Sequence, residues 1–467
     1  MLDLLQHPRA VVFVLLVSQL ILRRILARKN RSNLPLPPGP KGYIGIGNLF
    51  DVPARHQEVE YSKLAQLYGD MVYLETFGTK ILVLSSPTMD LFEKRSSRYS
   101  DRSDFPMLCG QMGYDAYFSL MRYGTRWRRQ RRLFHEQFNP TAVKQFHPLI
   151  LDERVRFVGE LYRTPKEFVH VLRSFIARIL LKMPYGIEPM GNGDPFITRP
   201  VEVTVGFAAA AAPGAFLVDF IPVLKYVPTW FPGASWKRFA QYYKRVANDA
   251  RVVPFQQLRE LQKLGTAPPS ALRTWIEKLP PVEDESYEEE RLCAQDTAGM
   301  SYVAGWDTSL GAALAAFLML ALHPEVQQRA QEEIDRVVGF AESQADTHRH
   351  ILHDPNVYPE PFKFKPERYI KDRRIDKQVF DPYSAAFGFG RRICPGRHVS
   401  LDSLYAMISS ALAFFDIAAP RDENGVCLLK GDFDGGILAH PKPFECIITP
   451  RSSRHEDLIH VTKNLEL

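Results

Sequence analysis

The sequence has few cysteines, and their spacing excludes two classes of structure. Its 467 residues hold five cysteines, an odd number, and no C-x-x-C pair. A secreted domain held by disulfides would have a dense, even set, and a zinc site would have ligands paired at short spacing. We expect neither, and we place the bulk of the chain in a reducing compartment. The cysteines are Cys109, Cys293, Cys394, Cys427 and Cys446.

A strong excess of charge of either sign is also absent. Lys and Arg number 59 against 53 Asp and Glu, which gives a formal charge of +6. This is modest for the length and argues against nucleic-acid binding. With 45% hydrophobic and 24% charged residues, the chain has enough apolar mass for a large core.

The longest apolar run near the N-terminus is shorter than the roughly 20 residues usual for a membrane span. It extends over Ala10–Leu22, is interrupted by Ser18 and Gln19, and is followed by a cluster of Arg and Lys. A cleaved signal peptide is the alternative, but its cleavage site would need small residues after the run. We therefore expect residues 1–31 to be an uncleaved anchor, with the basic flank and the body on the cytoplasmic side.

A proline-dense stretch, residues 34–40, follows the anchor. Its prolines disfavour helix and stiffen the chain. It could be a plain linker or a docking ligand for a partner, but its place after an anchor favours a rigid spacer. We assign residues 32–53 to this hinge and residues 54–467 to one domain, because composition does not shift further along.

Hydrophobic periodicity in that domain is mostly helical, and internal repeats are lacking. The fold class we expect is mainly α with a minor β part. Expected helices are Arg126–Phe138, Lys244–Leu264 with a break or kink at Pro254, Tyr287–Leu322 and Pro324–Val338. Expected extended pieces are Met71–Glu75, Ile81–Leu84 and Phe444–Ile448.

The strongest chemical signal is F-x-x-G-x-R-x-C-x-G, from Phe387 to Gly396. A chance match to five such positions in a chain of this length is on the order of one in ten thousand. A cysteine that binds iron must ionise, and nearby positive charge such as Arg392 stabilises the thiolate. Gly390 and Gly396 let the backbone turn tightly. The alternative is a buried structural cysteine in a glycine turn.

This motif resembles the cysteine loop of the cytochrome P450 family, and the resemblance implies heme b with Cys394 as the iron ligand. The segment Ala304–Ser309 is similar to the family's oxygen-activation signature. There Gly305 permits close approach, and the Thr308 hydroxyl can bond to the Ala304 carbonyl and open the helix. The resemblance implies that Asp307 and Thr308 relay protons. The alternative for this apolar stretch is a second membrane span.

Other motifs extend the resemblance along the chain. Trp127 and Arg131 match the family's W-x-x-x-R, which implies contact with a heme propionate, although an amphipathic basic helix would show the same pattern. Phe387, Arg392, Gly305 and Gly396 are expected beside the cofactor as well. Segments resembling the family's P-E-R-F and C-terminal regions are Pro366–Tyr369 and Gly436–Pro443.

One segment of the family pattern is missing. Members carry a helix with E-x-x-R between the regions that here end at Gly339 and resume at Ile351, and its Glu and Arg brace the arginine represented by Arg368. Residues 333–336 fit E-x-x-R but lie in the preceding charged helix, where this spacing suits a solvated pair. The sequence thus predicts a fold that lacks this helix, and a gene model or splice form missing roughly 50 residues, the length of one helix and a few strands.

The resemblance implies a monooxygenase at the endoplasmic reticulum membrane, anchored by one span. Its expected partners are an NADPH-cytochrome P450 reductase, membrane lipid and a hydrophobic substrate such as a terpenoid, polyketide or polycyclic aromatic, in secondary metabolism or xenobiotic oxidation. We expect the substrate pocket to draw on Phe105–Phe118, Phe207–Leu217 and Tyr302–Thr308. The alternatives are a truncated, heme-deficient member without catalysis and a reductase-independent isomerase, dehydratase or peroxygenase.

Overall fold

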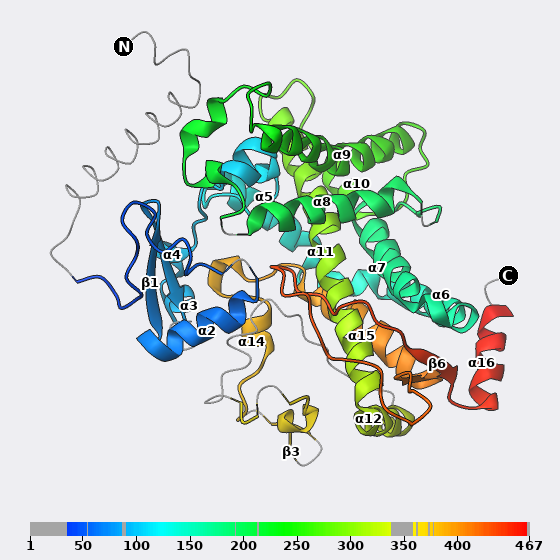
Figure 1. Cartoon of the computed structure of the whole chain (residues 1–467). Coiled ribbons are helices and arrows are strands. Elements are labelled where there is room, and N and C mark those ends of the chain that lie inside the picture. Colours follow the sequence, from blue (N-terminus) through cyan, green and yellow to red (C-terminus); the bar gives the residue numbers. More distant parts are fainter. Residues whose placement is uncertain are drawn as a thin grey trace, which may run out of the picture.

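The computed structural model describes residues 35–337 and 358–464, except 54, 86–89, 192, 213, 361–362, 372–373 and 377. The expected anchor, residues 1–31, and the start of the hinge lie outside the described residues, as does the junction at 339–351. Within the described ranges the chain is predominantly helical with small sheets, which confirms the expected class (Figure 1).

The helices and strands follow one another in a long α-rich order. The larger helices are α2 (Gln57–Tyr68), α5 (Thr125–Phe138), α6 (His147–Arg163), α7 (Phe168–Tyr185), α8 (Pro195–Ala211), α9 (Ser235–Lys263), α10 (Ala271–Glu277), α11 (Tyr287–Leu322), α12 (Pro324–Val337), α15 (Arg397–Phe414) and α16 (Ser453–Asn464). Short helices are α3 (Asp90–Lys94), α4 (Ser96–Tyr99) and α14 (Tyr383–Ala386). The strands are β1 (Met71–Thr76), β2 (Thr79–Leu84), β3 (Ile370–Lys371), β4 (Arg374–Ile375), β5 (Phe415–Ala418) and β6 (Ile447–Pro450).

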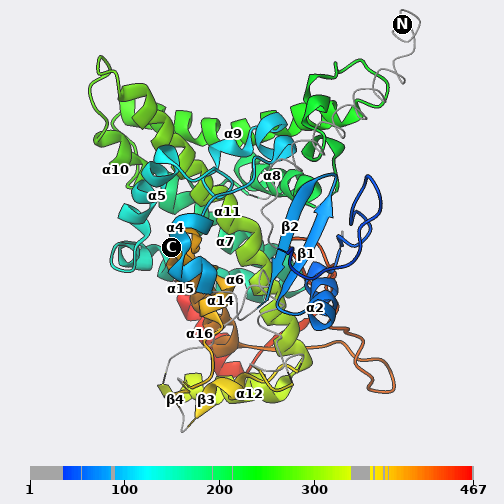
Figure 2. The same ribbon diagram turned by 90° about the vertical axis from the view of Figure 1, so that its left-hand side faces the viewer.

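Helix α11 is the centre of the fold, and α5, α7, α8, α9 and α15 pack around it (Figures 1 and 2). Its first turn carries Glu288, Glu289 and Glu290, which favour the positive end of the helix dipole. By length and composition α11 could also cross a membrane. Its many buried residues, from Cys293 to Ala321, instead make it the core helix of the domain.

Ion pairs of a buried carboxylate connect this core helix to its neighbours. Asp296 on α11 pairs with Arg251 of α9 and, at 3.1 Å, with Arg126 of α5. Burial raises the pKa of Asp296, and the two guanidinium groups act against that rise. Breaking one side of such a pair leaves a buried charge uncompensated, so these bonds help fix the positions of three helices.

The described residues form three sheets, and each is a two-stranded antiparallel pair. In the first, the turn between β1 and β2 places Phe77 at φ +47° and Gly78 at φ +80°. The proline-rich segment runs beside this pair, because the Tyr73 N–H donates to the Pro38 carbonyl at 2.8 Å. The part of the expected hinge that is described is therefore packed against β1.

The helix predictions are largely confirmed. Helix α11 has the predicted ends, and α5 and α12 match within a residue over the described part. Helix α9 begins nine residues earlier than predicted and continues through Pro254. A break there is therefore absent, and the alternative, a kink at Pro254, stays a prediction. The last predicted strand was misplaced, because β6 begins at Ile447, where its residues pair with β5.

Candidate functional site

The loop before Cys394 is shaped by two glycines with left-handed backbone. Gly388 has φ +75° and Gly390 has φ +51°, conformations that side chains rarely adopt. A Cβ at Gly390 would overlap the Phe92 carbonyl oxygen of α3, so only glycine lets the loop approach this helix. The Cys394 N–H then donates to the Phe387 carbonyl at 2.7 Å, which closes the turn.

The Cys394 side chain is half-buried, and opposing effects act on its ionisation. Burial raises the pKa of the thiol, while the backbone N–H groups of Gly396 and Arg397 and the guanidinium groups of Arg131 and Arg397 lower it. Arg131 also donates to the Ile393 carbonyl, and Arg397 donates to the Cys394 carbonyl at 3.0 Å. The loop thus holds a thiol surrounded by donors and cations that favour its anion.

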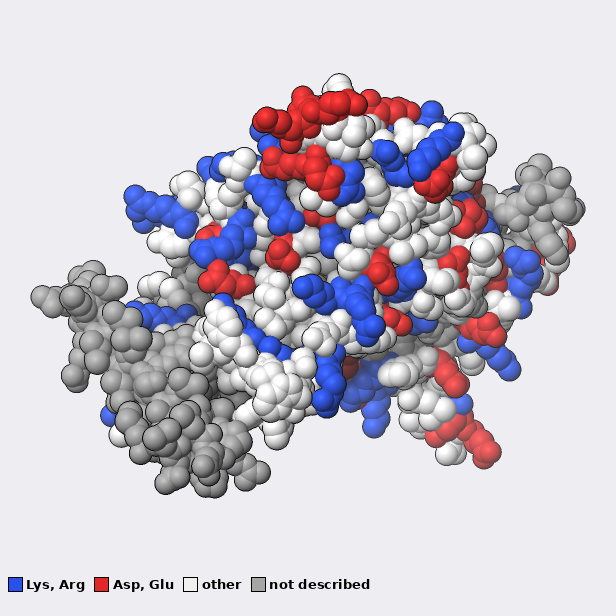
Figure 3. Space-filling model, turned by 90° about the horizontal axis from the view of Figure 1, so that it is seen from above, with Lys and Arg blue, Asp and Glu red and all other residues white. Residues whose placement is uncertain are grey.

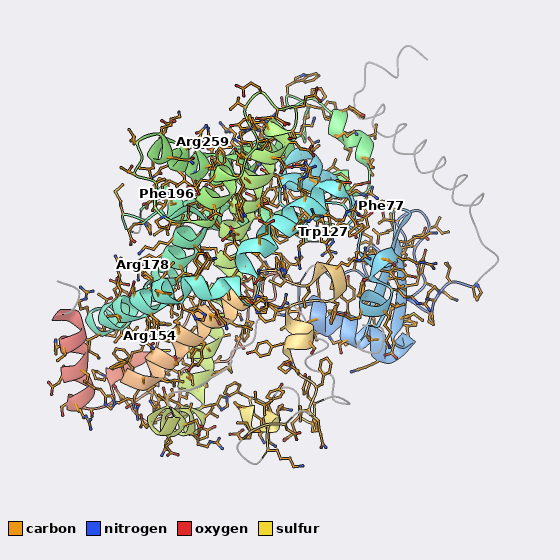
Figure 4. The ribbon with its side chains drawn as sticks, turned by 180° about the vertical axis from the view of Figure 1, so that it is seen from behind. Phe77, Trp127, Arg154, Arg178, Phe196 and Arg259 are labelled. Carbon is orange, nitrogen blue, oxygen red and sulfur yellow. The ribbon has the colours of Figure 1, made fainter. Side chains whose placement is uncertain are left out.

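A cavity of about 710 Å³ opens above this thiol, within the size range of small-molecule sites. Helices α5, α7, α11 and α15 and the cysteine loop supply its wall. All but one of the predicted site residues line it, namely Trp127, Arg131, Gly305, Thr308, Phe387, Arg392, Cys394 and Gly396. The structure therefore brings together residues that lie up to 269 positions apart in the chain, from Trp127 to Gly396. Figure 4 shows Trp127 on α5, near the middle of the molecule.

Three guanidinium groups line the same cavity, those of Arg102, Arg131 and Arg392. Burial lowers the pKa of all three, to about 10 for Arg131 and for Arg392. The positive charges of Arg102 and Arg131 also lower the pKa of Arg392. A half-buried cluster of like charges is unfavourable unless an anion joins it. This donor set fits the two carboxylates of a heme.

Arg392 has a different role from the one predicted from the sequence. It donates to the carbonyls of Ser100 at 2.7 Å, Phe118 at 3.1 Å and Met121 at 2.8 Å, and its guanidinium lies 4.5 Å from the centre of the Trp127 ring. The positive charges that lower the pKa of the thiol belong to Arg131 and Arg397. Arg392 instead fastens the loop to the chain around residues 100–121, because its five N–H donors suit several carbonyls at once.

The oxygen-activation segment of α11 is only partly as predicted. The Thr308 hydroxyl donates to the Ala304 carbonyl at 3.0 Å, as expected. The expected opening is absent, since α11, whose residues are all described, stays α-helical through this point. Gly305 has a packing role as well, because a Cβ there would lie 2.8 Å from Leu180 Cδ2 of α7. Asp307 is the predicted site residue that does not line the cavity.

The substrate wall predicted from the sequence needs correction. Among the described residues of 207–217, none lines the cavity, and only Phe118 does so from 105–118. Helix α7 supplies that wall through Ile176, Ile179, Leu180, Met183 and Pro184. Neither this helix nor Arg102 was predicted from the sequence, because neither carries a motif that distinguishes a cavity wall from ordinary core or surface.

Arg368, which the missing segment would brace, makes other contacts. Its guanidinium donates to the carbonyls of Pro359, Glu360, Lys363 and Lys365. The next residue back, Glu367, pairs with Arg329 of α12. Local carbonyls and surface ion pairs, among them Lys363–Glu360 and Lys365–Glu360, therefore hold this region in the part of the chain that is described.

Comparison with known proteins assigns the family. The sequence model of the cytochrome P450 family matches residues 37–351 and 347–448. A cytochrome P450 monooxygenase of Coprinopsis cinerea, COX1, is 34% identical over 95% of this chain and 97% of its own, and COX2 of the same fungus is 35% identical over 94% and 93%. Tryptamine 4-monooxygenase of Psilocybe cyanescens is 32% identical over 94% of this chain and 98% of its own. The chain therefore belongs to the cytochrome P450 family and is a monooxygenase.

Proposed function

We propose that the chain binds heme b through Cys394 and inserts one oxygen atom of O2 into a hydrophobic small molecule. The observation that carries this proposal is the single cavity onto which the Cys394 loop, three guanidinium groups and Thr308 all open. A Cβ at Gly396 would meet only Phe134, at 4.0 Å, so this glycine leaves the space beside Cys394 clear. The residues present thus fit a heme.

Each residue then has a distinct task. Heme iron supplies the binding and activation of dioxygen. Cys394 would supply the thiolate, Trp127 and Arg131 would hold the propionates, and Arg392 would keep the cysteine loop in place beside the cofactor. Thr308 presents its hydroxyl oxygen at the cavity wall. Asp307, the residue before Thr308, supplies protons to this hydroxyl.

Replacing Cys394 with alanine tests the assignment. We expect loss of the red-shifted carbon-monoxide Soret band of thiolate-ligated heme, because no other residue of the motif offers a thiolate. Cys427→Ala, which removes a half-buried cysteine away from the cavity, is the matched control and should keep the band. An undiminished band in Cys394→Ala would contradict the proposed ligand.

Electrons are proposed to come from NADPH through a membrane-bound flavoprotein reductase. Arg391, in the Cys394 loop, and Arg128 of α5 are exposed, and both lie 5.5 Å from the centre of the Tyr123 ring. Exposed basic side chains close to the thiolate favour an acidic electron donor on this face. The intact Asp307 and Thr308 pair favours this route over a reductase-independent isomerase, dehydratase or peroxygenase.

The proposed location is the endoplasmic reticulum membrane, with residues 1–31 as anchor, 32–53 as hinge and 54–467 as the cytoplasmic catalytic domain. Exposed apolar side chains support contact with lipid, namely Ile44, Phe50, Leu217, Tyr226 and Trp230. The β1–β2 turn, where Figure 4 labels Phe77, and the segment between α8 and α9 lie on one side of the molecule (Figures 1 and 2). The rings of Phe77 and Phe220 lie 5.6 Å apart.

The proposed substrate is uncharged and hydrophobic, such as a terpenoid, polyketide or polycyclic aromatic, in secondary metabolism or xenobiotic oxidation. The wall from α7 is aliphatic, and among the described residues that line the cavity none is Asp or Glu. A protonated amine like that of the Psilocybe relative's tryptamine would lack a counter-ion there. Acidic side chains instead gather on the outer surface, where Figure 3 shows a ridge of them. Glu283, Asp284 and Glu285 are among the exposed acidic residues.

A truncated, heme-deficient member is the second candidate. The family match is divided near residues 347–351. The alignment with COX1 has 503 positions yet covers 95% of 467 residues, about 444, so some 59 positions have no counterpart in this chain. We propose that a longer transcript encodes roughly 50 residues with E-x-x-R between Gly339 and Ile351, the length of one helix and a few strands.

Sequencing transcripts across this junction tests the second candidate, together with heme binding by both forms. We expect an additional coding segment, and heme uptake that is stronger in the longer form. Uninterrupted genomic sequence joining Gly339 to Ile351 would contradict the excision.

A further inference from the structure

Asp307 and Thr308 are neighbours in α11, yet their side chains lead to different places. Successive residues of an α-helix point about 100° apart. Thr308 lines the cavity with Ala304 and Gly305, whereas Asp307 is not among its described lining residues. The Asp307 carboxylate instead meets His440, with 2.8 Å between Oδ2 and Nε2.

His440 lies on the C-terminal hairpin, residues Asp432–Lys442, which covers this face of α11. One helical turn after Asp307 stands Gly311, where a Cβ would lie 3.2 Å from Cε1 and 3.3 Å from Nδ1 of His440. Contacts that short would require the ring to shift by a few tenths of an ångström. Glycine at this position therefore lets the imidazole rest on α11 within reach of the carboxylate.

Backbone hydrogen bonds join the two arms of the hairpin and also hold its tip. The Asp434 N–H donates to the His440 carbonyl at 2.9 Å, and the Lys442 N–H donates to the Asp432 carbonyl at 2.9 Å. At the tip, the His56 N–H donates to the Gly435 carbonyl at 2.9 Å. The ring of His440 is thus held over α11 by backbone bonds that do not depend on Asp307.

The pair also reaches solvent, since the side chains of His440 and Asp307 are 24% and 21% exposed. A carboxylate only accepts hydrogen bonds, so the shared proton is carried by Nε2. Other charged groups near His440 are Asp434, whose Oδ1 accepts the His440 N–H at 3.2 Å, and the Lys442–Asp432 pair. His56 adjoins the tip of the same hairpin.

We propose that His440 positions Asp307 and links it to solvent, an inference that rests on the proposed monooxygenase function. When both nitrogens of the His440 ring carry a proton, Nε2 gives its proton to Asp307 Oδ2 and the ring is left neutral with the proton on Nδ1. The neutral ring then takes up a proton from a hydronium ion of the solvent, which becomes water, so that His440 and Asp307 together move a single proton inward. Protons used at the cavity then enter through the face of α11 that the C-terminal hairpin covers.

The test replaces His440 in the heme-loaded full chain. His440→Leu should lower the product formed per NADPH about tenfold, the scale at which outer partners of a reacting group act. His440→Gln retains an N–H donor and should recover part of that loss. Lys442→Gln, a change of an exposed residue on the same hairpin, should behave as wild type. A larger solvent deuterium isotope effect in His440→Leu than in wild type would identify proton supply as the affected step.

A second measurement does not require turnover. If the pair exists in solution, Asp307→Asn and His440→Leu should be non-additive in the equilibrium constant for urea unfolding. Additive effects, or wild-type coupling and isotope effect in His440→Leu, would overturn the inference alone. A wild-type chain that takes up heme but oxidises no hydrophobic compound would overturn the proposed function, and this inference with it.

Discussion

Replacing Gly390 with alanine tests whether close contact with α3 holds the Cys394 loop. Gly390 has φ +51°, its N–H donates to Glu93 Oε1 at 2.8 Å, and a Cβ there would overlap the Phe92 carbonyl oxygen and lie 3.1 Å from Ser96 Cβ. The backbone oxygen cannot rotate away as a side chain could. The loop must therefore move, and Cys394 moves with it.

The expected loss of stability in Gly390→Ala follows from these contacts. A left-handed conformation costs a residue with a Cβ about 1–2 kcal/mol, and loss of the hydrogen bond to Glu93 costs about 1 kcal/mol more. Overpacking adds about 1–3 kcal/mol. We expect Gly390→Ala to lower the free energy of unfolding by about 3 kcal/mol or more.

Gly425→Ala is the matched control, because Gly425 has φ +78° but no neighbouring atom within 4 Å of a Cβ. The free energy of unfolding of this variant should fall only by about 1–2 kcal/mol, the cost of the left-handed backbone conformation. Urea unfolding measures both variants, and the carbon-monoxide spectrum reports whether thiolate ligation survives. Equal losses of stability in the two variants, with an unchanged spectrum in Gly390→Ala, would refute the reasoning.

Two further predictions concern the cavity and its surroundings. Thr308→Ala should keep heme but release more of the NADPH electrons as peroxide, because the hydroxyl beside Ala304 is lost; peroxide assays with unchanged coupling would contradict this role. The N–H groups of Tyr123 and Arg102 and the Arg122 guanidinium lower the pKa of Asp101 to about 2, so its stabilising effect is present above the usual carboxyl pKa and is lost as the pH falls through 2. Asp101→Asn should therefore flatten the loss of stability between about pH 4 and pH 2 in acid unfolding, and a pH dependence like that of wild type would exclude Asp101 as its source.

The sequence by itself determined the cysteine loop and the central helix. The Phe387–Gly396 motif depends on local chemistry, since left-handed turns need glycine at Gly388 and Gly390. The ends of α11 at Tyr287 and Leu322 also follow from periodicity within one stretch of chain, and both were predicted.

The tertiary structure decided the features that depend on distant segments. It brings Arg131 as well as Arg397 close enough to lower the pKa of the Cys394 thiol. It also gives Asp307 a hydrogen-bond partner 133 residues away, and it places α7 in the wall of the cavity. It also sets the start of β6, which follows pairing with β5. Arginines at neighbouring positions cannot be told apart from the sequence, and neither can apolar residues on different helices. Only the packing of distant segments decides which of these side chains face the thiol or the cavity.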